Sequence, residues 1–313
     1  MTRTFAAIGL AAAACLALSS CASGDTSNAG SGGEGGSGDG LTIAVVTPYL
    51  GNATTKEVID LFKEEGKTRG WDVSVEDTAG DMNKLNSAFQ NAAAQKPDAI
   101  VLGMGDPTQI SLGLKAAADA EVPVFAIDAA EADGILANVT SDNQDLGEQS
   151  ANALIEAIGG DGSIVMLTHD PHPGVKARAE GAREVFTKAG ITILEEKHIE
   201  VPGPVDNARK AVQDIVSAQG DKLNGIWGGW DEPALGATQA LNAANVTDVP
   251  VVGVDGQDFA IAEIDKGGPF VATVKQNWPE IAKKVADLIA DNAKGTKPEQ
   301  TQFELPGTLY TKK

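Results

Sequence analysis

Two tryptophans lie three residues apart in the stretch WGGWDEPALG (227–236), in a chain with only eight Phe, four Trp and two Tyr among 313 residues. Trp227 follows Ile226 in an apolar run, so we expect it in a protein core. Trp230 lies where that run meets the start of a predicted helix, and in open α/β sheets this edge is where ligands bind. We therefore predict that Trp230 forms a wall of a pocket.

Two aspartates occupy matching places in an internal repeat. Segments 103–129 and 228–256 each contain a Gly-rich strand end, an acid-Pro helix start, an Ala- and Leu-rich helix, and a Val-Pro-Val run that ends in Asp. The final aspartates are Asp128 and Asp255. The alternative explanation is that any two strand–helix–strand units look alike. If the repeat is real, both carboxylates lie at the carboxyl ends of buried parallel strands and face one cleft.

Apolar runs alternate with amphipathic, helix-like stretches over the rest of the chain. Short β-branched runs separated by helices predict parallel sheets, and therefore doubly wound α/β domains. The 273 residues from Leu41 to Lys313 suit two domains better than one. The apolar runs are 41–47, 71–77, 99–104, 122–128, 135–142, 163–169, 191–200, 223–230, 249–255 and 270–276.

The first forty residues predict export. Residues 1–20 combine Arg3 with a short apolar stretch, which is typical of a signal peptide. The ending Leu-Ser-Ser-Cys resembles a lipobox, in which Cys21 becomes lipidated; an ordinary cleaved signal is the alternative. Residues 21–40 then form the lipidated Cys and a flexible Gly/Ser-rich tether. No second cysteine would remain for a disulfide or a catalytic thiol.

The chain is strongly acidic, with a formal net charge of −20. This balance argues against binding nucleic acid, or an anionic membrane, through the protein surface. Its simplest consequence is solubility. We expect contact with a membrane only through the lipid anchor.

Five short motifs together resemble the ribose-binding-like, type I solute-binding proteins of ABC importers. The resemblance implies two doubly wound parallel-sheet lobes joined by a three-segment hinge near 142–143, 276–277 and 306–307. Residues 41–142 with 277–306 would form the N-terminal lobe, and 143–276 with 307–313 the C-terminal lobe. The motifs are VTSDN (139–143), ARAEG (177–181), WDEPALGA (230–237), VVGVDG (251–256) and ATVKQ (272–276).

The same resemblance implies a set of ligand-binding residues. Asn52 matches the Asn after the first strand, Arg178 the arginine of the second lobe's first helix, and Gln276 the hinge glutamine. Asp128 and Asp255 match the two strand-end aspartates. Carboxylates accept hydrogen bonds from adjacent hydroxyls, while a guanidinium donates and offsets their charge. For Arg178 the alternative is a surface position, paired with one of the glutamates that follow it.

Departures from the ribose-type pattern affect the expected ligand. Thr54-Thr55 stands where those members have an aromatic pair, Ala129 where they have Arg, and Trp230 where they have Asn. Losing the aromatic pair argues against D-ribose itself. Tyr49 and Trp230 would supply apolar cover from other directions.

The loop THDPHPG (168–174) contains His169 and His172. Their spacing could indicate a metal site, but no third conventional ligand cluster accompanies them. We expect no metal or other cofactor here. The prolines instead suggest a loop over the cleft, with His172 in contact with ligand, and we expect His198 to be structural.

We expect that the protein is not an enzyme. Gly66-Lys67-Thr68 lacks the upstream glycine of a phosphate-binding loop and reads as a helix C-terminus. A glycosidase would need one of its two carboxyls protonated near neutral pH, whereas we expect Arg178 to keep both strand-end aspartates ionised.

These observations predict a lipid-anchored, extracytoplasmic component of an ABC importer. It would bind a small sugar or sugar alcohol, with a pentose or short polyol favoured, and deliver it to a permease driven by a separate ATPase. We expect a monomer. The alternative is a protein that presents a sugar-like signal to a membrane sensor.

Overall fold

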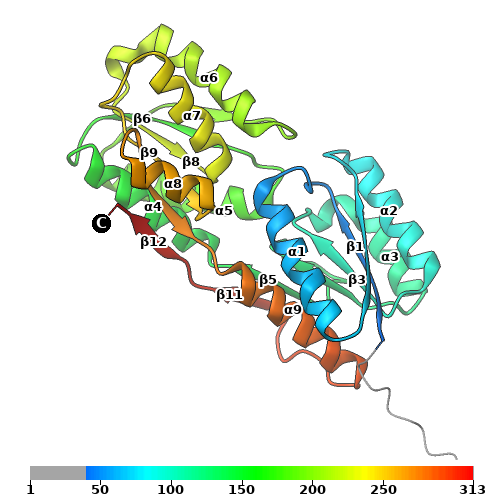
Figure 1. Cartoon of the computed structure of the whole chain (residues 1–313). Coiled ribbons are helices and arrows are strands. Elements are labelled where there is room, and N and C mark those ends of the chain that lie inside the picture. Colours follow the sequence, from blue (N-terminus) through cyan, green and yellow to red (C-terminus); the bar gives the residue numbers. More distant parts are fainter. Residues whose placement is uncertain (1–39, 313) are drawn as a thin grey trace, which may run out of the picture. The chain divides into compact units, whose positions relative to one another are not determined.

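The computed structural model describes residues 40–312 (Figure 1). The predicted signal peptide, Cys21 and nearly all of the tether lie outside the described residues. Within the described part of the chain, no helix is both long enough and apolar enough to cross a membrane.

Two six-stranded sheets form the frame of the structure, and their strands follow the same order relative to the chain. All pairs in the first sheet are parallel, and only the β10–β12 pair of the second is antiparallel. The first sheet contains, in spatial order, β11 (Gln302–Leu305), β5 (Ala137–Ser141), β4 (Val124–Ile127), β3 (Ala99–Gly103), β1 (Thr42–Thr47) and β2 (Asp72–Asp77). The second contains β12 (Thr308–Thr311), β10 (Phe270–Lys275), β9 (Val251–Asp255), β8 (Gly225–Gly228), β6 (Ser163–Thr168) and β7 (Thr192–His198).

All ten predicted apolar runs form strands, whereas β11 and β12 were not predicted. The two missed strands are four residues long and their side chains are half-buried or exposed. They lie at the sheet edges, where one face and one row of backbone groups contact solvent, so polar residues are tolerated there. An apolar run is therefore a poor signal for such strands.

Helices cover both faces of each sheet (Figure 1). On the first sheet, α1 (Ala53–Thr68) and α9 (Trp278–Ala293) pack on one face, and α2 (Met82–Gln95) and α3 (Ser111–Asp119) on the other. On the second, α4 (Asn143–Ala157) and α5 (Pro173–Ala189) pack on one face, opposite α6 (Pro204–Gln219), α7 (Asp231–Ala243) and α8 (Asp258–Lys266). The central strands are apolar on both sides because both sides are covered.

The chain passes between the sheets at three places. It leaves β5 for α4, which packs on β9 and β10, and it leaves β10 for α9, which packs on α1. The third passage joins β11 to β12. We call the first sheet with its helices the first lobe, and the second sheet with its helices the second lobe. This is the two-lobed α/β architecture that the sequence predicted.

The internal repeat is also a structural repeat. Strands β3 and β4 hold the same places in the first sheet as β8 and β9 in the second. Asp128 directly follows β4, and Asp255 is the last residue of β9. Both have a positive φ, 46° and 129°, which side chains rarely adopt. Strain of this kind gathers at functional sites.

Close packing of α4 on α5 positions one side of the cleft between the lobes. A Cβ on Gly147 would lie 2.0 Å from the carbonyl oxygen of Arg178, and one on Gly181 would lie 2.4 Å from that of Gln144. Glycine at these two places therefore lets the backbones of α4 and α5 approach each other closely.

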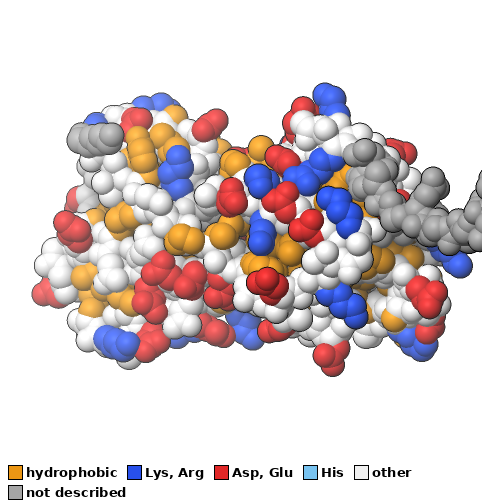
Figure 2. Space-filling view, turned by 90° about the horizontal axis from the view of Figure 1, so that it is seen from below, with side chains coloured by type: hydrophobic (Ala, Val, Ile, Leu, Met, Phe, Trp, Pro, Cys, Tyr) orange, Lys and Arg blue, Asp and Glu red, His pale blue; other side chains and the backbone are white. Residues whose placement is uncertain are grey.

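Charged side chains of both signs lie together on the face seen in Figure 2. Ion pairs among the described residues include Arg69–Asp287 at 2.7 Å and Lys283–Asp287 at 2.6 Å. Partly exposed pairs contribute only about 0–1 kcal/mol each, so the acidic excess acts mainly on solubility.

Candidate functional site

One cavity gathers most of the residues singled out from the sequence. It contains about 380 Å³ of space not filled by atoms, including its opening to solvent. Of the eight predicted ligand-binding residues, all but Gln276 line it. The lining residues are Tyr49, Asn52, Thr54, Thr55, Met104, Asp128, His169, His172, Val175, Arg178, Val201, Trp230 and Asp255.

Topology explains why residues so far apart in sequence meet here. Tyr49, His169 and Trp230 follow the carboxyl ends of β1, β6 and β8, and the two strand-end aspartates follow or end β4 and β9. The carboxyl ends of parallel strands lie at one edge of a sheet, so each lobe presents its residues at one edge. The two edges share this cavity.

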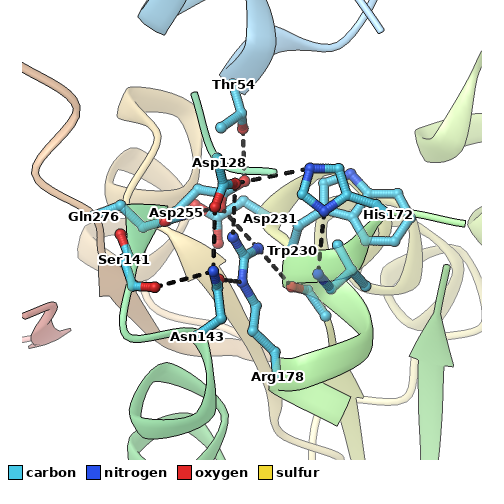
Figure 3. A network of polar contacts seen from close by, with 12 residues as sticks. Thr54, Asp128, Ser141, Asn143, His172, Arg178, Trp230, Asp231, Asp255 and Gln276 are labelled. Atoms are coloured by element: carbon cyan, nitrogen blue, oxygen red, sulfur yellow. Dashed lines mark hydrogen bonds and ion pairs between the residues drawn. The ribbon is translucent and has the colours of Figure 1, made fainter. Parts of the chain in front are cut away.

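Arg178 is the centre of the polar network drawn in Figure 3. It is 2 % exposed. Its Nη1 donates to Asp255 Oδ1 at 3.2 Å and to the Gly229 carbonyl at 3.1 Å, and its Nε donates to Asn143 Oδ1 at 2.7 Å. The alternative of a surface position on α5 is therefore wrong, because the first turns of that helix point into the cleft.

Asp128 keeps one carboxylate oxygen without a hydrogen bond from any described residue. Thr140 and Asn143 donate to Oδ1. Oδ2 has only longer ion-pair distances, 3.7 Å to both Arg178 Nη2 and His172 Nε2. A hydroxyl group placed in the cavity could therefore donate to Oδ2.

Asp255 is bonded more fully than Asp128. Gln276 Nε2 donates to its Oδ1 at 2.7 Å, beside the Arg178 bond, and Thr54 Oγ1 donates to its Oδ2 at 2.6 Å. Burial raises the pKa of Asp255 to about 6, although the Arg178 charge and the hydrogen bonds from Thr54 and Gln276 oppose that rise. Desolvation therefore outweighs the attraction of Arg178, but a carboxyl with a pKa of about 6 is still mostly ionised at neutral pH, as expected.

Gln276 lies behind the cavity wall and supports Asp255. Its amide donates to that carboxylate, while its buried Oε1 has no partner among the described residues. The predicted hinge glutamine therefore acts in this structure as an orienting group.

A second buried carboxylate near Asp255 was not singled out from the sequence. Asp231, 0 % exposed, accepts from Thr273 Oγ1 at 2.7 Å and from the Gln257 backbone N–H at 2.9 Å. Burial, and next the negative charge of Asp255, raise the pKa of Asp231 well above its ordinary value. The acid-Pro helix start marked its position, but an acid at a helix start usually indicates only a favourable helix dipole.

Aromatic rings form the other part of the wall. The Tyr49 ring lies 5.8 Å from those of His169 and His172, and the Trp230 ring lies 5.9 Å from that of His169. Trp230 is 4 % exposed and its Nε1 donates to Glu232 at 3.4 Å. Trp230 therefore lines the cavity.

Trp227, by contrast, lies in the core of the second lobe. Its side chain is 0 % exposed, and its Nε1 donates to Ser150 Oγ at 2.9 Å. β8 ends between the two tryptophans, so they face different environments although they are close in sequence.

Three hydrogen bonds that involve the first turns of α1 join the lobes beside the cavity, in addition to the bond from Asn143 to Asp128. Besides Thr54–Asp255, the Ala53 backbone N–H donates to Glu232 Oε1 at 3.4 Å, and Gln257 Nε2 donates to Glu57 Oε2 at 2.6 Å. Burial raises the pKa of Glu232 to about 7. Sequence reasoning missed these contacts, because Glu232 was not singled out within its motif and Ala53, Glu57 and Gln257 belong to none.

Among residues 40–312, no group of three or more His, Cys, Asp or Glu side chains is placed so that it could hold a metal ion. Gly66-Lys67-Thr68 ends α1, as predicted. His198 stacks on His169 with ring centroids 5.0 Å apart.

Known proteins resemble this chain over most of its length. Residues 43–297 match the family model described as a periplasmic binding protein domain. The chain is 28% identical to the ribose import binding protein of Bacillus subtilis (strain 168), covering 87% of this chain and 88% of that one. It is 27% identical to a xylitol-binding protein of Mycolicibacterium smegmatis, over 88% of this chain and 77% of that one.

Solved structures agree. A solute-binding protein of an ABC transporter from Agrobacterium vitis, with bound allitol, superposes with a TM-score of 0.82 at 29% identity, over 88% of this chain and 96% of that one. A second such protein, from Mycobacterium smegmatis with bound glycerol, superposes with a TM-score of 0.80 at 26% identity. The match covers 87% of this chain and 94% of that one. Given this two-lobed fold and cleft, the chain belongs to the periplasmic binding protein family, whose members bind solutes and are not enzymes.

Proposed function

We propose that this protein is the extracytoplasmic solute-binding component of an ABC importer and that it binds a small sugar or sugar alcohol between its lobes. The observation that carries the proposal is the cavity itself, where two aspartates and an arginine face aromatic rings. Carboxylates and a guanidinium match the hydrogen-bonding pattern of hydroxyl groups, and aromatic faces cover the carbon skeleton.

Charge around the cavity favours a neutral ligand. Asp128 and Asp255 approach one guanidinium, that of Arg178, which compensates one of them at most. A ligand that carried its own carboxylate or phosphate would add negative charge to a buried site that already has little compensation. A polyhydroxylated molecule adds donors without charge.

The ligand class follows from the relatives together with the residues that differ. The relatives named above bind ribose, xylitol, allitol and glycerol. Thr54 and Thr55 line the cavity where ribose-type members have an aromatic pair, and Thr54 is committed to Asp255. A pentose or a short sugar alcohol is therefore favoured over a large ring sugar.

Ligand bridges the lobes in this proposal, and a permease recognises the closed form. A ligand shifts the balance between open and closed forms only by the difference in its affinity for them. Contacts from both lobes provide that difference, because Asn52 and Asp128 belong to the first lobe, and Arg178 and Asp255 to the second.

Several further features belong to the same proposal. The lobes comprise residues 41–142 with 277–306, and 143–276 with 307–313; the three passages of the chain between the sheets support these limits. A lipidated Cys21 anchors a monomer to the cell membrane. The permease works with a separate ATPase.

A thermal-shift screen tests the proposed ligand class. The purified protein is melted with pentoses, hexoses, tetritols and pentitols, because a ligand that binds only the folded form adds about 2.7 kcal/mol of stability at a hundred times its dissociation constant. We expect a narrow group of pentoses or polyols to raise the Tm. Asp128→Asn should lose that shift, whereas Asp214→Asn, on an exposed face of α6, should keep it. No shift with any carbohydrate would refute the sugar assignment.

A further inference from the structure

His169 occupies the cavity wall but is not among the predicted ligand-binding residues. It directly follows β6, is 7 % exposed and lines the cavity. Rings surround it: Tyr49 and Trp230 toward the cavity, and His198 stacked at 5.0 Å. A buried histidine with both ring nitrogens bonded would be an ordinary core residue. This one is bonded at a single nitrogen.

Hydrogen bonding determines which nitrogen of His169 carries the proton. Its Nδ1 lies 2.9 Å from the carbonyl oxygen of Ile199. A carbonyl can only accept, so Nδ1 is the donor and holds the hydrogen. Burial, the largest influence, lowers the pKa of His169 and keeps the ring neutral. The other nitrogen, Nε2, therefore presents a lone pair.

That lone pair is buried and unused. Nε2 of His169 has no hydrogen-bond partner among the described residues. The hydroxyl of Tyr49, on the neighbouring ring, is likewise buried without a described partner. Leaving a buried acceptor unpaired is costly, so a group that donates to it contributes more than an average hydrogen bond.

His172 has the opposite arrangement. The Val175 backbone N–H donates to its Nδ1 at 3.2 Å, so Nδ1 is the acceptor. Burial lowers the pKa of His172 to about 4, which leaves the ring neutral with its hydrogen on Nε2, facing Asp128. The two histidines of one loop therefore offer different groups: His172 a donor, and His169 an acceptor.

We propose that His169 Nε2 accepts a hydrogen bond from a hydroxyl of the bound sugar or polyol, and that the cavity thereby selects ligands with a free hydroxyl beside Tyr49 and Trp230. This inference rests on the proposed function and adds a specificity-determining residue to it. A methyl group or an ether oxygen at this place cannot donate and leaves Nε2 unpaired. Sites built around such a group discriminate strongly against analogues that lack the hydroxyl.

Paired ligands test the proposal by isothermal titration. The probes are xylitol, ribitol and D-ribose, each compared with its terminally deoxygenated counterpart. We expect the wild type to prefer the hydroxylated member of a pair by about 10–100-fold. In His169→Phe, which keeps a ring but removes the acceptor, this preference should fall to near one. His198→Phe keeps the stacked ring and should leave the preference unchanged.

Different failures have different meanings. Equal affinity of the wild type for both members of every pair, or an undiminished preference in His169→Phe, overturns the role of His169 and leaves the proposed function standing. If no carbohydrate of the thermal-shift screen binds to the wild type, these three probes included, both proposals fail together.

Nitrogen NMR of the wild type gives a second test that does not depend on a variant folding. A long-range imidazole spectrum should show His169 protonated at Nδ1 and His172 protonated at Nε2. Adding the bound probe should move the Nε2 resonance of His169 much more than its Nδ1 resonance, since only Nε2 gains a partner. An unmoved Nε2 resonance, or a His169 protonated at Nε2, overturns the proposal.

Discussion

Replacing Asp255 by asparagine should weaken ligand binding and at the same time stabilise the protein without ligand. The Oδ1 position of Asp255 receives two donors, Arg178 Nη1 and Gln276 Nε2. An amide at this place keeps its oxygen there, so its NH₂ group takes the Oδ2 position. A donor then replaces the acceptor that faces the cavity and Thr54.

The expected loss of affinity follows from the bond that disappears. A hydrogen bond to a charged group contributes about 1.5–3 kcal/mol, which corresponds to roughly 10–100-fold in dissociation constant. Isothermal titration with the sugar or polyol found by the thermal-shift screen measures it. Asp214→Asn, an exposed change of the same chemistry, is the control and should have no effect.

Stability should change in the opposite direction. The folded-state pKa of Asp255, about 6, lies above its ordinary value of 3.8. This difference in pKa means that the folded protein destabilises the ionised form of Asp255 by roughly 3 kcal/mol. Because the pKa of Asp255 is raised in the folded protein, its favourable contribution to the free energy of unfolding is complete below pH 3.8. That contribution is lost as the pH rises through about 6. A neutral amide avoids that loss.

Thermal melts without ligand distinguish this reasoning from simple damage to the fold. At about pH 8 the Asp255→Asn protein should melt several degrees above the wild type, and at about pH 4 the two should melt together. The affinity of the wild type for its ligand should also decline as pH falls through about 6. A variant that melts lower at both pH values and binds normally would refute the assignment of Asp255 to the site.

Three further substitutions test other parts of the structure. Trp230→Phe should abolish a ligand-induced change in tryptophan fluorescence, and a surviving change would belong to another tryptophan. Gly147→Ala should lower stability by about 1–3 kcal/mol, since its Cβ would overlap the backbone of α5, whereas Gly220→Ala meets only an ordinary contact at 3.6 Å and should be nearly neutral in denaturant titrations. Thr54→Val removes a bond between the lobes, so small-angle scattering of the ligand-free protein should report a larger radius of gyration; an unchanged radius would contradict that role.

Local sequence determined the elements and their class. Apolar runs of six to ten residues between amphipathic stretches are sufficient to predict parallel strands, because burial of the central strands on both faces demands apolar side chains throughout. The repeat around Asp128 and Asp255 then predicted equivalent places in two sheets, and the sheet orders agree with it. The short edge strands β11 and β12 were not predicted in this way, because a strand with solvent on one side does not need apolar residues throughout.

Only the tertiary structure decided how the polar groups share their bonds. The internal repeat identified Asp128 and Asp255, and the family resemblance identified Arg178, but the partners of each oxygen depend on distances across the cleft. Burial raises the pKa of Asp255 despite a neighbouring guanidinium. No sequence pattern indicates how strongly a side chain is desolvated in the folded protein. The same holds for His169, whose acceptor role follows from one backbone carbonyl thirty residues away.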